Sequence, residues 1–146
     1  MNEEDVFKNI QKLKEKRKLM IEKFVEKFEA NKNWVSAKEA IYFRRREKEI
    51  RLELFKLRNG LDNELLKEFI ETEKGHHEFY TCIRKMGYAT AIDLNNNCIK
   101  NSFSAGVKMV GYYCDYCDLF HLSSHPVKRA DLNIKPILTI RGKTTV

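Results

Sequence analysis

Two cysteines and two histidines lie close together in the segment CDYCDLFHLSSH, which runs from Cys114 to His125. Two residues separate Cys114 from Cys117, a spacing that lets both sulfurs turn toward one point in a tight knuckle. Zinc accepts thiolate and imidazole ligands in a tetrahedral shell, and Cys₂His₂ is a common structural set. The segment therefore predicts one structural Zn²⁺, bound by Cys114, Cys117, His121 and His125.

The fourth ligand has alternatives, because His125 would have to curl back toward the knuckle. The residues that could replace it are Cys82, Cys98, His76 and His77. A metal-free apolar hairpin with free thiols is the alternative to the whole site. The ligand pairs are much closer together than in a DNA-reading C₂H₂ finger, where about 12 residues separate them. No recognition helix fits between them.

Adjacent ligands favour a closed zinc shell, whereas catalytic zinc keeps one position open for water. We therefore predict no catalytic residue and a binding protein rather than an enzyme. A zinc-dependent nuclease or hydrolase is the minor alternative, in which Asp115 or Asp118 beside the ligands would act as a base.

The same segment carries the motif Y-x-C-x-x-C-x-x-F-H-L-S-S, from Tyr112 to Ser124. It resembles a motif of small phage and bacterial zinc-ribbon or zinc-finger-like proteins, over roughly residues 80–125. The resemblance implies a compact zinc module. Asp118 departs from it, because a glycine often follows the second cysteine of the motif. In size and general character, without a motif, the chain also resembles small accessory proteins of T4-like phages that modulate host mRNA metabolism.

The first half of the chain has helical periodicity, with apolar residues three and four apart. One helix is expected to end near Ala30, and a capping box at Ser36–Glu39 starts a second, which Gly60 ends. A third is expected over roughly 62–73. The first two should form an antiparallel hairpin. The apolar seam of the second helix contains the following residues: Ala40, Phe43, Glu47, Ile50, Leu54 and Leu57. Glu47 and, on the first helix, Arg17 interrupt these stripes, which would also suit a homodimer paired through the hairpin.

The second half is richer in aromatic and β-branched residues. We expect strands over 107–113, 120–123 and 137–141, a short helix over 90–100, and an irregular stretch or short strand over 80–86. The chain is thus predicted to be an α+β protein. Residues 1–75 would form a charged helical hairpin or coiled-coil region, and residues 76–146 a zinc-binding module.

The 146-residue chain has a net charge of +7 and a pI of about 9.2. Its N-terminus has no apolar stretch typical of a signal peptide, so we expect a cytoplasmic protein with reduced thiols, in the host cytoplasm if a phage encodes it. The basic balance favours nucleic acid, RNA or single strands, as partner. A host protein docked on the helical hairpin is the alternative. Candidate nucleic-acid-binding residues are Lys12, Lys14, Lys16, Arg17, Lys18, Arg44, Arg45, Arg46, Tyr112, Tyr116, Lys128 and Arg129.

Overall fold

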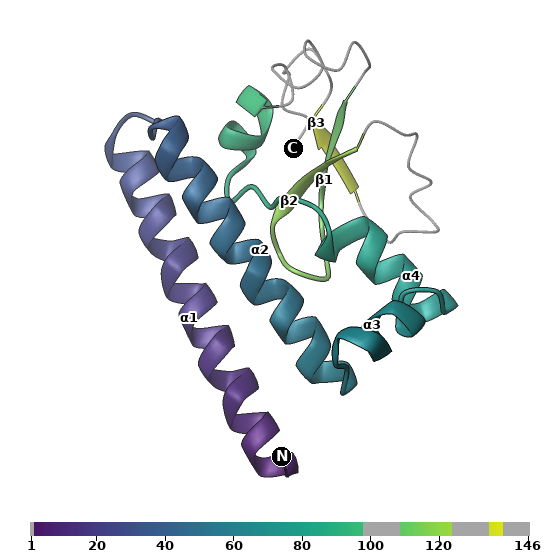
Figure 1. Cartoon of the computed structure of the whole chain (residues 1–146). Coiled ribbons are helices and arrows are strands. Elements are labelled where there is room, and N and C mark those ends of the chain that lie inside the picture. The colour runs from purple at the N-terminus through teal and green to yellow at the C-terminus, as the bar shows by residue number, and fades with distance from the viewer. Residues whose placement is uncertain (1, 98–108, 124–134, 139–146) are drawn as a thin grey trace.

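A computed structural model describes residues 2–97 and 109–123, and the backbone of residues 135–138. Two long helices, α1 (Glu3–Ala30) and α2 (Ala37–Asn59), lie side by side as an antiparallel hairpin (Figure 1). Ser36 begins α2 as predicted, because its hydroxyl accepts a hydrogen bond from the Glu39 amide at 3.2 Å. Gly60 ends it in the left-handed conformation, with φ +64°. The predicted helical hairpin is confirmed.

Aromatic rings join α1 to α2 near the loop between them. Phe24 and Phe43 stack with their centroids 4.1 Å apart, and Phe28 and Ala40 complete this cluster. On α2 the predicted seam is buried from Ala40 to Leu54, whereas Leu57 is only half-buried. The apolar spacing of α2 therefore predicted the face that packs on α1.

The third predicted helix is two short ones, α3 (Asn63–Phe69) and α4 (Glu73–Glu78). Thr72 separates them, because its hydroxyl donates to the Phe69 carbonyl at 2.6 Å and accepts from the Gly75 amide at 3.1 Å. The packing also requires Gly75, since a Cβ there would lie 2.0 Å from the Phe69 oxygen. The chain therefore turns between α3 and α4 instead of continuing as one helix.

The predicted irregular stretch or strand over 80–86 is wrong at its start, because α4 continues directly into a π-helical turn, η1 (Phe79–Ile83). Its wider turn leaves carbonyl groups that need partners outside the helix. The Tyr112 hydroxyl donates to the Thr81 carbonyl at 2.7 Å, and Arg51 donates to the Cys82 carbonyl. Long-range contacts, which local sequence does not show, thus stabilise η1.

A small antiparallel sheet follows, with strand order β2-β1-β3. Strands β1 (Val110–Tyr113) and β2 (Phe120–Ser123) form the predicted hairpin, and Tyr112 lies opposite His121. Strand β3 (Lys135–Leu138) begins two residues before the prediction, and residues 139–141 lie outside the described part. On the other edge of β2, Tyr88 and Phe120 exchange two backbone hydrogen bonds.

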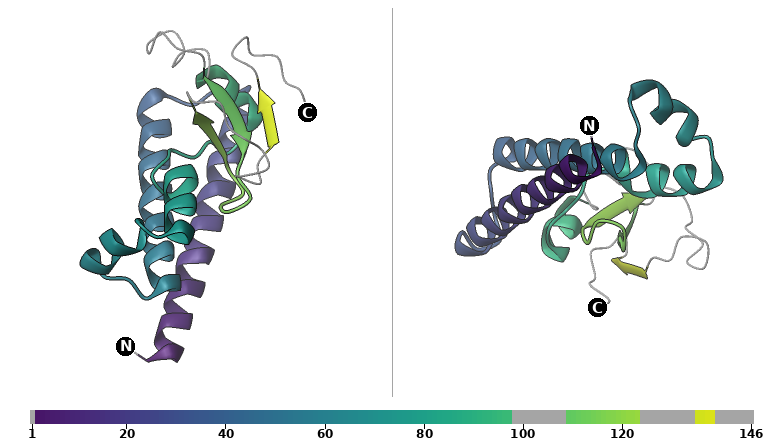
Figure 2. Two further views of the ribbon diagram at one scale, coloured as in Figure 1. Left: turned by 90° about the vertical axis from the view of Figure 1, so that its right-hand side faces the viewer. Right: turned by 90° about the horizontal axis from the view of Figure 1, so that it is seen from below.

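The sheet lies on one side of the helical hairpin, beside α2 (Figure 2). Between them is a core cluster that includes Phe55 of α2, Cys82 and Ile83 of η1, and Tyr112 and Leu119 of the hairpin. The described part is thus mostly helical with a small sheet. None of its helices is both long and apolar enough to cross a membrane.

Candidate metal centre

Four side chains from two segments, η1 and the β1–β2 hairpin, meet in the core. Cys82 comes from η1, Cys114 follows β1, Cys117 lies in the hairpin turn, and His121 lies on β2. Their ligand atoms all lie within 4.8 Å of one another, and all four residues are buried. Three sulfurs and one imidazole nitrogen at such distances could bind a metal ion.

The hairpin turn brings Cys114 and Cys117 together. The Cys114 amide donates to the Leu119 carbonyl, and the Asp118 amide donates to the Cys114 carbonyl, each at 2.8 Å. Asp118 has φ +59°, in the left-handed region that glycine adopts most easily and that Asp tolerates better than most residues. The Tyr113 hydroxyl donates to the Asp118 carboxylate at 2.7 Å. This explains how the turn closes with Asp118 where similar motifs often have glycine.

Asp118→Ala should lower the free energy of unfolding by about 1 kcal/mol, because alanine lacks the Tyr113 contact and is strained at positive φ. Asp118→Gly should lie closer to the wild type, since glycine adopts this φ without strain. Urea unfolding of both zinc-loaded variants measures the difference. An alanine variant as stable as the glycine variant would contradict a left-handed Asp118.

His121 is oriented by its other ring nitrogen. Nδ1 lies 2.8 Å from the Met86 carbonyl oxygen, which can only accept, so Nδ1 carries the proton. Nε2 is then free as a ligand, and it lies 3.3 Å from the Cys117 sulfur. Metal-binding histidines usually donate their second N–H to a carbonyl or carboxylate in this way.

Hydrogen bonds among the thiols shift the pKa values of Cys114 and Cys82 in opposite directions. Bonds from Cys117 and Cys82 lower the pKa of Cys114 to about 3. The bond to Cys114, followed by the bond to Cys117 and burial, raises the pKa of Cys82 above its ordinary value. Binding a metal would displace the Cys82 proton.

The donor set fits zinc better than a hard cation, because thiolates and imidazole are the ligands of structural zinc. In a tetrahedral site with Zn–S bonds of about 2.3 Å, neighbouring ligand atoms are about 3.8 Å apart. The ligand atoms lie within 4.8 Å of one another, so they would have to move only slightly closer together to bind the ion. Four protein ligands also fill a tetrahedral shell.

Cys82 is one of the residues that the sequence allowed in place of His125. His76 and His77, which it also allowed, lie elsewhere: His77 Nδ1 is 2.6 Å from the Tyr116 hydroxyl, and the His76 ring packs on Tyr80. His125 and Cys98 lie outside the described residues, so their assignment stays a prediction.

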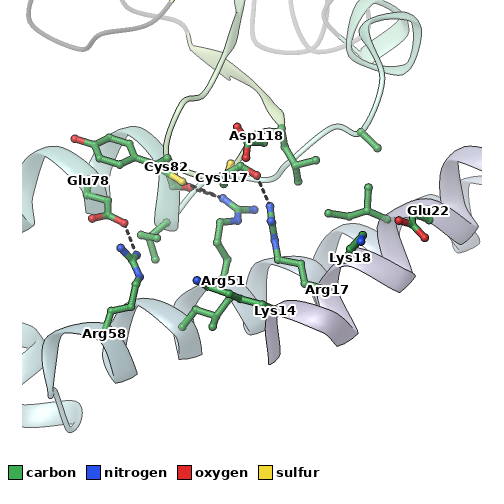
Figure 3. Close-up of a pocket in the computed structure, with 16 residues that line it drawn as sticks. Lys14, Arg17, Lys18, Glu22, Arg51, Arg58, Glu78, Cys82, Cys117 and Asp118 are labelled. Atoms are coloured by element: carbon green, nitrogen blue, oxygen red, sulfur yellow. Dashed lines mark hydrogen bonds and ion pairs between the residues drawn. The ribbon is translucent and has the colours of Figure 1, made fainter. Parts of the chain in front are cut away.

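A buried charge network connects this cluster to the helical hairpin. Glu47 of α2 is fully buried and accepts hydrogen bonds from Arg17 of α1, at 2.9 Å, and from Arg51, one turn along α2. Arg17 also donates to the Cys117 carbonyl at 2.6 Å, and Arg51 to the Cys82 carbonyl (Figure 3). We call Arg17, Glu47 and Arg51 the charge network. The two polar residues that interrupt the apolar stripes are thus partners within one chain.

The charge network matches the charge that a zinc site would carry. Three thiolates, one neutral imidazole and Zn²⁺ sum to one negative charge, and two arginines with one glutamate sum to one positive charge. Arg51 also lies 3.9 Å from the Cys82 sulfur. Burial opposes its charge, but the hydrogen bonds and charge of Glu47 outweigh this, so the pKa of Arg51 lies above its ordinary value. The guanidinium of Arg51 is therefore charged at neutral pH.

A cavity of about 540 Å³ opens beside the network, between α1, α2 and the hairpin turn (Figure 3). Lys14 and Lys18 of α1 line it, together with Arg58, whose guanidinium is paired with Glu78 at 2.6 Å. Cys82 and Cys117 lie at its inner wall. Acidic side chains on the same wall offset part of the positive charge.

The candidate nucleic-acid-binding residues occupy different environments. Four of these candidates on α1 are exposed and make no ion pair within the described part: Lys12, Lys14, Lys16 and Lys18. On α2, Arg45 is exposed, whereas Arg46 pairs with Glu49 at 3.2 Å. Tyr116 is 46% exposed. Arg17 belongs to the charge network, and Lys128 and Arg129 lie outside the described residues.

Two of these candidates are corrected by their burial. Arg44 is 8% exposed, and both oxygens of Asp93 accept hydrogen bonds from it, at 2.7 and 2.9 Å. This ion pair ties α2 to the helical turn that follows Thr90. Tyr112 is 2% exposed, so no base can stack on its ring. Both side chains hold the core together rather than face a ligand.

No family model, no curated protein and no solved structure matches this chain. Its function is therefore inferred from the geometry of the site itself. The polar interruptions at Arg17 and Glu47 were the one signal in the sequence for the residues around the metal cluster. Cys82 offered no comparable signal, because it is a lone cysteine far from the other ligands.

Proposed function

We propose that this chain is a small, basic zinc-binding protein that associates with nucleic acid, RNA or single strands. The observation that carries the zinc assignment is the buried set Cys82, Cys114, Cys117 and His121, with ligand atoms within 4.8 Å of one another. With four protein ligands, the ion has no open position for water, which favours a structural role over catalysis.

Zinc in this position would join the β-hairpin and η1, which carry the ligands, and the charge network would hold both on α1 and α2. Small modules rarely bury enough apolar surface to fold alone, and a bound metal contributes folding free energy directly. The role that we assign to the metal is therefore to fix the sheet against the helical hairpin.

Unpaired positive charge supports the nucleic-acid assignment. The chain carries 28 Lys and Arg against 21 Asp and Glu. Several of these cations are exposed and make no ion pair within the described residues, among them Lys12, Lys16 and Arg45. Phosphates neutralised by such side chains release counterions, so affinity depends on charge and falls with salt.

The zinc-loaded protein should bind a fluorescent single-stranded RNA in an anisotropy titration, and the affinity should fall steeply from about 50 to about 200 mM KCl. The falling affinity reflects the counterions released at each phosphate contact. Absence of binding at the lowest salt would contradict the nucleic-acid part of the proposal and leave the zinc part standing.

A second function, a protein–protein adaptor with purely structural zinc, is favoured by exposed apolar residues on the hairpin. Phe7 on α1 is 62% exposed, and Trp34 in the α1–α2 loop is 66% exposed. Large exposed apolar side chains are often anchors of protein interfaces. Binding to a protein would tolerate salt far better than binding to RNA.

A further inference from the structure

One face of α2 points away from α1 and carries cations together with an aromatic ring. Lys38, Tyr42 and Arg45 follow each other at spacings of four and three, which places them on one side of the helix. All three are exposed, and Tyr42 is 68% exposed. This face is therefore accessible along the first two turns of α2.

Further along α2, the same side borders a groove of about 480 Å³ between α2 and η1. Its floor is apolar and half-buried, formed by Leu52, Phe79 and Met86. Its rim carries Arg45, Lys48 and Arg84. We call these six residues the α2 groove.

The charge of the α2 groove is not neutralised by its neighbours. Within the described part of the chain, Arg45, Lys48 and Arg84 make no ion pair. Glu49, the acidic residue on the same side, is already paired with Arg46. Arg84 is held over the Tyr80 ring at 4.7 Å, so its guanidinium is kept near the rim. The rim thus presents a positive charge around an apolar floor.

This combination matches one class of ligand. Proteins that bind single strands combine cations that track the phosphates with apolar and aromatic surfaces that receive the bases. A duplex keeps its bases stacked inside and offers only its backbone and groove edges. A simple anion would gain nothing from contact with the apolar floor of the groove.

We propose that the α2 groove binds a nucleotide unit of a single-stranded nucleic acid, with its base on Leu52, Phe79 and Met86 and its phosphates at Arg45, Lys48 and Arg84. Tyr42 and Lys38 extend the same track toward the α1–α2 loop. This proposal rests on the proposed function and adds to it the place and the chemical form of the ligand.

The test compares two double variants of the zinc-loaded full chain by anisotropy with a single-stranded RNA of about 12 nucleotides. Arg45→Ala/Lys48→Ala removes two rim cations. Lys67→Ala/Lys74→Ala removes the same charge from exposed positions on α3 and α4, which are not among the candidate nucleic-acid-binding residues. Each phosphate contact adds about 0.7 to the salt slope for a single strand. The first variant should therefore lower the slope by about 1.4 and the affinity by roughly 25-fold at 0.1 M salt. The second should change neither by more than about half as much.

Equal losses in both variants, with the wild type binding RNA, would overturn the α2 groove and leave the proposed function intact. No RNA binding by the wild type would overturn both.

Inorganic polyphosphate and poly-glutamate serve as anions without bases. Weaker competition by both, at equal charge, supports a base on the groove floor. If either polyanion competed as well as RNA, the proposed base contact would be overturned. Equal competition by poly-glutamate would point to an acidic protein as the ligand. Circular dichroism of both variants confirms that each is folded.

Discussion

Cys82→Ser is expected to abolish stoichiometric zinc binding and to unfold the β-hairpin while α1 and α2 stay helical. Serine offers no thiolate, so the shell would lose one of its four protein ligands. Structural zinc in small modules contributes apparent binding free energies of about 10–16 kcal/mol, which is folding free energy for the segments that it joins. The expected loss is therefore several orders of magnitude in zinc affinity.

Zinc content and far-UV circular dichroism of the purified variant measure this effect. Cys98→Ser is the matched control, because it removes a thiol that lies outside the described residues. It should retain one zinc per chain. Zinc loss in Cys98→Ser with zinc retained in Cys82→Ser would show that the fourth ligand is Cys98, which the sequence also allowed.

The second large effect is expected at the charge network. Glu47→Gln keeps the size of the side chain but leaves Arg17 and Arg51 without a carboxylate. Glu47 is 0% and Arg51 4% exposed, so the Arg51 side chain cannot turn fully into water without moving the core. Breaking a buried ion pair by removing one partner costs about 3–5 kcal/mol. We expect a loss of stability of that order.

Thermal and urea unfolding of zinc-loaded Glu47→Gln measure the loss. Glu49→Gln, two residues along α2, is the control, because its side chain is 64% exposed in its pair with Arg46. It should change the free energy of unfolding by no more than about 0.5 kcal/mol. Similar effects of the two substitutions would contradict a buried role for Glu47.

Local signals in the sequence were sufficient for the two long helices and for part of the metal cluster. The hydroxyl of Ser36, the left-handed Gly60 and the apolar spacing of α2 act within a few residues, so they could be read directly. The same is true of Cys114, Cys117 and His121, which the C-x₂-C knuckle and its returning strand bring together.

Contacts between distant segments could not be read in that way. Cys82 lies 32 residues before Cys114, and only the packing of η1 on β1 brings them together. Arg17 and Glu47 are 30 residues apart, so the sequence showed two interruptions but not their pairing. Tyr112, a candidate for nucleic-acid binding from the sequence, points into the core instead, where the Thr81 carbonyl accepts a hydrogen bond from its hydroxyl.

Elemental analysis of protein purified without added metal tests the central claim most directly. The buried cluster of Cys82, Cys114, Cys117 and His121 predicts about one zinc per chain. It also predicts that a strong chelator that removes the zinc lowers the unfolding temperature and unfolds the hairpin before the helices. Protein that contains no zinc, takes up none when zinc is added, and unfolds unchanged in its presence would contradict the account.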